Sequence, residues 1–167
     1  MTLKMLDSSG LDNSKCAPHT LDMLAQFSVL SRLKEHKNSN LAAKMRVYDG
    51  ENLHDVDPKA KTMQEYKDVA GVDEGMNGMS TRFAFKILSQ TFNFDAEEIA
   101  ADPVHLMYVL ETSIKREQFP EELEDKLLGF IKDHLSARYS EQVGNEIQKA
   151  YLESYNEYGQ NLFDRYL

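Results

Sequence analysis

The sequence has very little cysteine: Cys16 is the single one among its 167 residues. One cysteine cannot form a disulfide within the chain, and it excludes a zinc site built from several cysteines. Nothing near Cys16 marks it as a nucleophile, so we expect a small, half-buried residue. The histidines are scattered without metal-ligand spacing, and we expect no metal site: His19, His36, His54, His105 and His134.

Long apolar runs are also missing from the sequence. No stretch is apolar for long enough to span a membrane. The first residues, Met1 to Met5, lack the apolar core of a signal peptide. These absences predict a cytoplasmic protein that makes no contact with membranes.

An excess of basic residues is absent as well. Lysine and arginine total 19 against 28 aspartates and glutamates, which gives a formal net charge of −9. A net-acidic surface does not attract nucleic acid or an anionic membrane. The composition, 41% hydrophobic and 28% charged, is otherwise that of an ordinary globular protein.

Local motifs of known catalytic chemistry are not found. There is no Walker A sequence, no kinase glycine loop, no HRD or DFG triplet, no HExxH and no GxSxG. Carboxylates cluster at 97–98 and 121–125, but both clusters fall in predicted first turns of helices, where they favour the helix dipole. We therefore expect no catalytic residue in this chain.

Neither end of the sequence carries the signals of a natural terminus. No strong element precedes Pro18, so residues 1–15 are predicted to be poorly ordered. Residues 161–167 keep an apolar pattern without a glycine, proline or polar stop. We expect the chain to be a fragment of a larger protein.

The pattern along the chain is almost wholly helical, which predicts an all-α fold. Start signals include a cap at Thr20, another at Asn40, a capping box from Thr62 to Glu65, and the pair Asp102-Pro103. Helices are predicted to begin at residues 20, 62, 103, 120 and about 137, and the one that begins at 62 ends at Gly71. Shorter helices are predicted over 41–45, 81–91 and, briefly, 95–100. Helices before residue 100 are short and those after 103 are long, which predicts two units, 16–101 and 102–167.

The loop at 75–82 is the most informative stretch. It is rich in glycine and opens directly onto a predicted helix that Ser80 caps. Arg82 then falls in the first helical turn, where the dipole disfavours a cation by roughly 0.3–1 kcal/mol unless an anion joins it. Backbone N–H groups, a hydroxyl and a guanidinium converging at a helix start are the components of a phosphate site. The alternative is that Arg82 pairs with Asp73 or Glu74 and that the glycines, Gly78 included, only make a turn.

A stripe of tyrosines marks the last predicted helix. Tyr151, Tyr155 and Tyr158 follow i, i+4, i+7 spacing, so they share one helix face. Such a stripe usually packs against another element. In a fragment it is expected to face solvent or a neighbouring copy in place of a missing partner.

The sequence Gly78-x-Ser80-x-Arg82 at a helix start, within a small helical bundle, resembles the sensor-2 element of AAA+ ATPases. In that superfamily the lid is a helical subdomain whose arginine reaches the phosphates of a nucleotide held by an α/β core. Longer strings resemble the bacterial PrkA family, and they cover nearly the whole chain from Cys16 onward: 27–34, 44–51, 57–61, 71–78, 116–120, 150–155 and 158–161.

The resemblance implies an AAA+ lid-like helical subdomain at 16–101 and the start of the PrkA C-terminal domain at 102–167. PrkA proteins are described as serine protein kinases, which implies ATP and Mg²⁺ as cofactors of the parent protein. Gly78, Ser80 and Arg82 would contact the nucleotide phosphates only with the missing AAA+ core, so the fragment alone is expected to bind no cofactor. The implied partners are that core, the rest of the C-terminal domain, a protein substrate and a possible second copy.

Two other functions stay open at this point. The parent is alternatively an AAA+ remodelling ATPase of the chaperone or protease type, which the absence of kinase triplets favours slightly. The third possibility is a non-catalytic helical interaction module in which Arg82 is merely salt-bridged.

Overall fold

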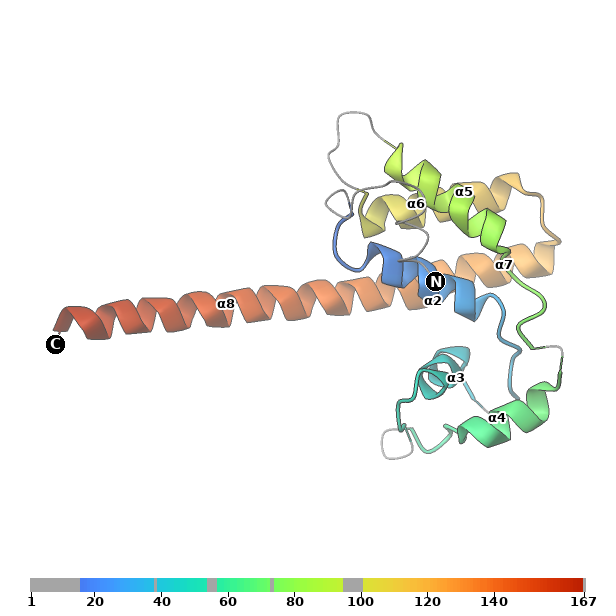
Figure 1. Ribbon diagram of the computed structural model, residues 1–167, viewed down its shortest axis with the longest axis horizontal. Helices are drawn as coiled ribbons and strands as arrows, with labels where there is room; N and C mark the ends of the chain where they lie inside the picture. Colours follow the sequence, from blue (N-terminus) through green and yellow to red (C-terminus); the bar gives the residue numbers. More distant parts are fainter. Residues whose placement is uncertain (1–15, 38, 54–56, 73, 95–100, 167) are drawn as a thin grey trace.

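The computed structural model describes residues 16–37, 39–53, 57–72, 74–94 and 101–166, and its elements are helices (Figure 1). Within these residues there are no strands, only isolated bridges between Cys16 and Ala101 and between His36 and Ser39. The predicted all-α class is therefore confirmed. In chain order the elements are α2 (Thr20–Leu30), α3 (Leu41–Tyr48), α4 (Met63–Ala70), α5 (Thr81–Phe92), α6 (Pro103–Arg116), α7 (Glu121–Gly129), the π-helix η2 (Phe130–Leu135) and α8 (Ser136–Tyr166).

Most helix starts follow the predicted capping residues. The side chains that accept a backbone N–H at the starts of α3, α4, α5 and α6 are Asn40, Thr62, Ser80 and Asp102. Thr62 and Glu65 form the complete capping box, and Gly71 ends α4 with a φ of 69°. The brief helix predicted at 95–100 and the N-terminal segment 1–15 lie outside the described residues.

The start of α2 differs from the prediction that Thr20 caps it. The N-cap residue is His19, which has a φ of 68° and makes no side-chain capping bond. Thr20 lies inside the helix and is fully buried. Its hydroxyl donates to the carbonyl oxygens of Ala17 at 2.9 Å and Ala101 at 3.5 Å. The hydroxyl thus donates to carbonyl groups, with the shorter bond to Ala17 three residues before it, instead of accepting a backbone N–H of the helix.

The C-terminal helices also differ from the prediction of two separate helices with a break near 136. The chain is helical without interruption from Glu121 to Tyr166, because η2 joins α7 directly to α8. No proline lies in this stretch, and Gly129 keeps helical dihedral angles. The π-helical turn buries Phe130, Ile131 and Leu135.

One hydrophobic core joins α2, α5, α6, α7 and η2. Its most buried members include Met23, Phe27, Ile87, Leu110 and Leu135, each at 0% exposure. The predicted division of the chain between 101 and 102 stays a prediction, and this core draws side chains from both sides of it.

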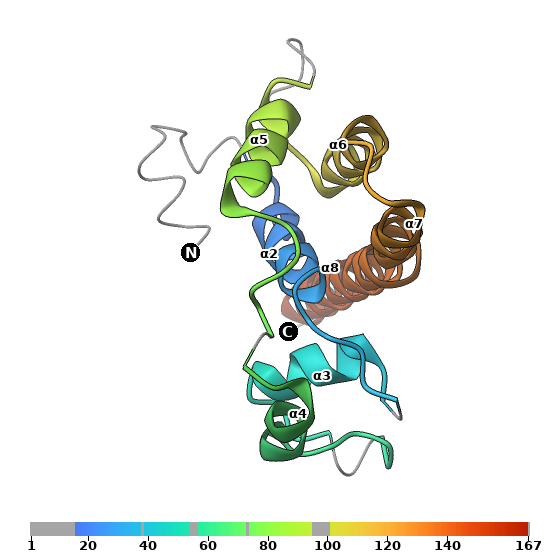
Figure 2. The same cartoon turned by 90° about the vertical axis from the view of Figure 1, so that its right-hand side faces the viewer.

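The helices α3 and α4 pack around a second, smaller cluster. It consists of Val47, Leu53, Ala60 and Tyr66. Figure 2 shows this pair of helices set apart from the rest of the molecule. We call the pair the α3–α4 unit.

The helix α8 projects away from both clusters toward the C-terminus (Figure 1). Tyr151, Tyr155 and Tyr158 are 69%, 66% and 66% exposed, so the tyrosine stripe faces solvent and does not pack against another described element. Among the described residues, none of the helices has the length and apolar character needed to cross a membrane.

Candidate functional site

Gly78 is the tightest point of the loop that leads into α5. Its φ of 118° lies in the region that favours glycine, and a Cβ built there would meet the Ser31 carbonyl oxygen at 2.4 Å. The next residue, Met79, donates its N–H to Ser31 Oγ at 3.0 Å. The loop therefore lies directly against the C-terminal end of α2, and only glycine permits that approach.

Arg32, just after the end of α2, also holds the loop through hydrogen bonds. Its Nε and Nη2 donate to the Met79 carbonyl oxygen at 3.1 and 2.9 Å. Its own carbonyl oxygen accepts the Gly75 N–H at 3.3 Å. Two donors in a fixed planar fork define the position of an acceptor more closely than a single donor does.

Arg82 follows this fixed loop and is exposed in the first turn of α5. Ser80 accepts the Phe83 N–H at 3.1 Å, so its hydroxyl caps the helix as predicted. Within the part of the chain that the structure describes, the Arg82 side chain forms no hydrogen bond or ion pair. The cation therefore stands at the positive end of the helix dipole without a described anion to offset it.

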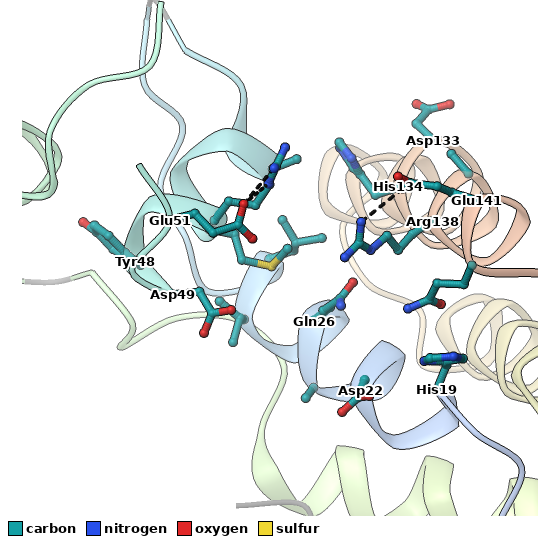
Figure 3. A pocket seen from close by; sticks show the side chains of 18 residues that line it. His19, Asp22, Gln26, Tyr48, Asp49, Glu51, Asp133, His134, Arg138 and Glu141 are labelled. Atoms are coloured by element: carbon teal, nitrogen blue, oxygen red, sulfur yellow. Dashed lines mark hydrogen bonds and ion pairs between the residues drawn. The ribbon is translucent and has the colours of Figure 1, made fainter. Parts of the chain in front are cut away.

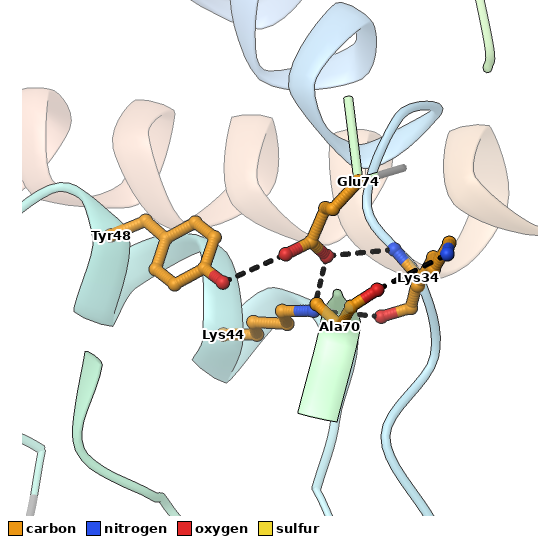
Figure 4. A network of polar contacts seen from close by, with 5 residues as sticks. All are labelled: Lys34, Lys44, Tyr48, Ala70 and Glu74. Atoms are coloured by element: carbon orange, nitrogen blue, oxygen red, sulfur yellow. Dashed lines mark hydrogen bonds and ion pairs between the residues drawn. The ribbon is translucent and has the colours of Figure 1, made fainter. Parts of the chain in front are cut away.

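The alternative pairing of Arg82 with Glu74 is wrong, because other groups engage the Glu74 carboxylate. Its Oε1 accepts the Lys34 N–H at 3.0 Å and pairs with Lys44 Nζ, and its Oε2 accepts the Tyr48 hydroxyl at 2.8 Å (Figure 4). The alternative pairing with Asp73 stays a prediction, since Asp73 lies outside the described residues.

Lys44 makes this cluster a buried polar network. It is 2% exposed, and its Nζ also donates to the Lys34 carbonyl oxygen at 3.1 Å. Lys34 Nζ in turn donates to the Ala70 carbonyl oxygen at 3.1 Å (Figure 4). A buried ammonium is tolerated only when it is paired and hydrogen-bonded, and both conditions hold here. The network ties the loop to the end of α2 and to the α3–α4 unit.

The network shifts the acidity of its members. Burial alone would raise the pKa of Glu74, but hydrogen bonds from Lys44, Tyr48 and the Lys34 backbone outweigh it, so the pKa lies below its ordinary value. Burial, and then the bond to the Glu74 carboxylate, raises the pKa of Tyr48. Glu74 therefore stays ionised and Tyr48 stays protonated at neutral pH, which keeps the network intact.

Two cavities are present near the α3–α4 unit, and Gly78, Ser80 and Arg82 line neither of them. The larger, of about 890 Å³, lies between α2, α3, η2 and the start of α8 (Figure 3). We call it the interhelical groove. The smaller, of about 420 Å³, lies beside the start of α4 and includes Leu53, Pro58 and Thr62.

The remaining candidate groups do not assemble into a site. Among the described residues, no group of three His, Cys, Asp or Glu side chains is arranged to hold a metal ion, and His54 is outside them. Cys16 is half-buried, as expected, and burial raises the pKa of its thiol. Of the acidic cluster at 121–125, Glu121, Glu122 and Glu124 lie in the first turn of α7, as predicted, while 97–98 lies outside the described residues.

Sequence reasoning missed the residues that hold the loop in place. Arg32 and Lys44 lie within the strings 27–34 and 44–51, but no local pattern assigns them to the 75–82 loop. Their partners are 47 and 30 residues away along the chain. A pairing of that kind becomes visible only once the helices are packed.

Comparison with known proteins assigns the chain to a family. The family model described as "PrkA serine protein kinase C-terminal domain" matches residues 42–167, and the model "PrkA AAA domain" matches residues 2–40. The chain belongs to the PrkA family. The two PrkA matches meet near residue 41, so Arg82 lies within the match to the C-terminal domain.

Individual PrkA relatives carry two different activity names. The chain is 64% identical over 164 residues to "Serine/threonine kinase YeaG" of Escherichia coli strain K12, and 36% identical over 174 residues to "ATP-dependent protease PrkA" of Bacillus subtilis strain 168. Each alignment covers 98% of this chain and 26% of the relative, so the chain spans about a quarter of the length of these proteins. No solved structure matches.

Proposed function

We propose that this chain supplies a helical lid and a phosphate-sensing arginine, Arg82, to the ATP site of a PrkA-family serine protein kinase. The observation that carries the proposal is the exposed guanidinium in the first turn of α5, on a loop held against α2. A cation at a helix N-terminus becomes favourable when an anion joins both the guanidinium and the helix dipole. The γ-phosphate of ATP is negatively charged, so it can interact favourably with both the guanidinium and the positive end of the helix.

The loop geometry supports a fixed backbone position for Arg82. Gly78 lies against Ser31, and Arg32 donates hydrogen bonds to Met79. Glu74 joins the other end of the loop to the α3–α4 unit. Arg82 therefore starts from a constrained backbone, which fixes the point from which its side chain leaves the helix toward a developing charge. Gly78 and Ser80 shape the helix start, and Ser80 completes its cap.

The nucleotide in this proposal is ATP with Mg²⁺, and the rest of its site belongs to an AAA+ core. The match of residues 2–40 to the PrkA AAA domain supports such a core in the longer protein. Other proposed partners are the remainder of the C-terminal domain, a protein substrate and a second copy, with the whole protein in the cytoplasm. The chain alone is expected to bind no nucleotide tightly.

A second candidate function has its own supporting observation. The Bacillus subtilis relative is named an ATP-dependent protease, so ATP hydrolysis coupled to protein remodelling is an alternative to phosphotransfer. A third candidate, a helical interaction module without any role for Arg82, is consistent with the exposed α8 face.

The test is Arg82→Ala in the full-length protein, with Arg116→Ala as the matched control. Arg116 is an exposed arginine at the end of α6 that has no described role in the loop. Loss of a donor aimed at phosphate charge is expected to slow ATP turnover by about a hundredfold or more, with little change in thermal stability. Equal turnover in both variants, or a change confined to the melting temperature, would contradict the sensor role.

The same protein preparations separate kinase from protease. Labelled γ-phosphate appears on a protein serine if the activity is phosphotransfer. Release of free phosphate together with cleavage of a protein substrate indicates the remodelling alternative. Either activity can depend on Arg82, so this comparison is independent of the sensor test.

A further inference from the structure

The interhelical groove is a feature of the described residues that the proposed function leaves unused. We propose that it binds a basic segment of a partner protein, in which lysine or arginine side chains alternate with apolar ones. The proposal does not depend on Arg82, which lies outside the groove.

The groove has the size and position of a binding site. Its volume of about 890 Å³ falls within the usual range for ligand sites, roughly 300–1,000 Å³. It lies where the α3–α4 unit meets the main helical body, and boundaries between packed units are frequent locations of such sites. Its lining includes the apolar side chains of Val29, Leu30, Met45 and Ala137.

The charge of the lining selects a cationic occupant. Asp22 on α2, Asp49 at the end of α3 and Asp133 on η2 come from three different elements (Figure 3). Within the described part of the chain, none of these three carboxylates has a hydrogen bond or ion pair. Three separated carboxylates fit several positive charges along an extended segment better than one compact ion.

The positive groups of the lining do not offset these aspartates. Arg46 pairs with Glu51 at 2.7 Å, and Arg138 pairs with Glu141 at 3.1 Å. Each arginine is therefore already matched by a carboxylate of the groove. The excess is negative, so a lysine- or arginine-rich segment is complementary to it.

A buried oxygen of Gln142 without a described hydrogen-bond donor also supports a partner that carries N–H groups. Gln142 Oε1 lines the groove, is buried, and has no hydrogen-bond partner among the described residues. A buried acceptor left without a donor has lost its hydrogen bond to water and gained none in return, which is unfavourable. A partner that carries ammonium, guanidinium or amide N–H groups would supply the missing donor.

Two backbone irregularities also border the groove. His19 has a φ of 68°, a left-handed conformation that a non-glycine residue rarely adopts, and it lines the groove. Asp133 and His134 lie in the π-helical turn η2, and such turns are frequent at functional sites. Irregular backbone of this kind is maintained against its energetic cost, which is typical of binding sites.

A bound metal does not explain the acidic lining. The described residues contain no group of three His, Cys, Asp or Glu side chains placed to hold one ion. Surface acidity in general does not explain it either, because the lining of the groove combines the carboxylates with apolar side chains and a buried acceptor. An amphipathic basic segment satisfies all three features together.

The first experiment removes the groove charge in the full-length protein. Asp22→Asn, Asp49→Asn and Asp133→Asn are combined, and the matched control combines Asp68→Asn, Glu122→Gln and Asp125→Asn, which lie outside the groove. The probe is a short fluorescein-labelled peptide of alternating lysine and leucine, titrated by fluorescence anisotropy. The groove variant is expected to bind at least about tenfold more weakly, while the control stays within about twofold. Equal weakening by both variants would overturn the proposal, because it would show that net charge alone attracts the peptide.

The second experiment fills the groove without changing its charge. Ala137→Trp places a large side chain in the lining, and Ala150→Trp places the same side chain on α8 outside the groove. Only the first is expected to weaken peptide binding, and circular dichroism confirms that both variants are folded. Unchanged binding in the Ala137→Trp protein would contradict the proposal, even if the triple-asparagine variant failed to fold.

A third measurement separates a partner protein from a second copy. Sedimentation velocity is run on the wild-type protein and on the Ala137→Trp variant. The proposal expects the same oligomeric state in both. Loss of self-association in the variant, without loss of peptide binding, would assign the groove to a second copy and overturn the basic-segment proposal.

Discussion

Arg32 and Met79 are joined by two hydrogen bonds across 47 positions of the sequence. The guanidinium donates from Nε at 3.1 Å and from Nη2 at 2.9 Å to one carbonyl oxygen. Met79 is buried and immediately precedes the residue that caps α5. The start of the helix that carries Arg82 is therefore positioned by the end of α2.

Arg32→Lys tests this bidentate contact. Lysine keeps the charge but has one donor group without the planar fork, so the free energy of unfolding is expected to fall by about 1–2 kcal/mol. Urea denaturation of the 167-residue chain measures it. Arg116→Lys is the control, since Arg116 is exposed at the end of α6. Equal stability of the two variants would show that the contact contributes nothing.

Gly78→Ala tests the close approach between the loop and α2. The added methyl group meets the Ser31 carbonyl oxygen at 2.4 Å, and φ is 118°. The expected destabilisation is about 2–4 kcal/mol, because both the clash and the backbone strain must be relieved.

Two other glycines separate these contributions. Gly75→Ala carries a positive φ of 85° with open space around its Cβ, so it is expected to cost only about 1 kcal/mol. Gly144→Ala lies within α8 with open space, so it is expected to stabilise by roughly 0.5–1 kcal/mol. If Gly78→Ala costs no more than Gly75→Ala, the contact with Ser31 is not restrictive.

Glu74→Gln tests the buried network and its pH dependence. The pKa of Glu74 is lower in the folded chain than its ordinary value of 4.5, so the ionised carboxylate stabilises the fold above that pH. The stabilisation is lost as the pH falls below 4.5 through the folded-state pKa. At neutral pH the variant leaves Lys44 without its counter-charge, and we expect a loss of roughly 3 kcal/mol.

Unfolding titrations at several pH values check this prediction. The difference between wild type and Glu74→Gln should be largest at neutral pH and should shrink in acid. Glu111→Gln is the control, because its pair with Lys115 is solvent-exposed and is expected to contribute little to stability. A wild-type-to-variant difference that does not change with pH would rule out the ionised network as its source.

The tyrosine stripe is expected to contribute little to the stability of the core. Tyr151, Tyr155 and Tyr158 are each more than half exposed, so replacing any one by serine should change the free energy of unfolding by less than about 0.5 kcal/mol. Leu110→Ala, at a fully buried position of α6, should cost about 2–5 kcal/mol. A large loss on replacing the tyrosines would mean that the stripe packs against another part of the protein.

Much of the secondary structure follows from the sequence because its signals are local. Ser80, Asp102 and the capping box at Thr62 each engage a backbone group three residues away, so neighbouring residues specify these helix starts. Thr20 shows the limit of that logic. Its hydroxyl donates to the carbonyl oxygens of Ala17 and of the distant Ala101 instead of accepting a helix N–H, and the predicted cap was wrong by one residue.

The features of the candidate site likewise fall into those that local sequence determines and those that tertiary packing determines. The position of Arg82 at the start of α5 and the cap by Ser80 are determined by the sequence itself, since propensity and capping act within one helical turn. Only the tertiary structure decides that Glu74 pairs with Lys44 instead of Arg82, that Gly78 meets Ser31, and that three aspartates from separate elements share one groove. These relationships join residues that are far apart along the chain, and packing of the helices is the physical event that brings them together.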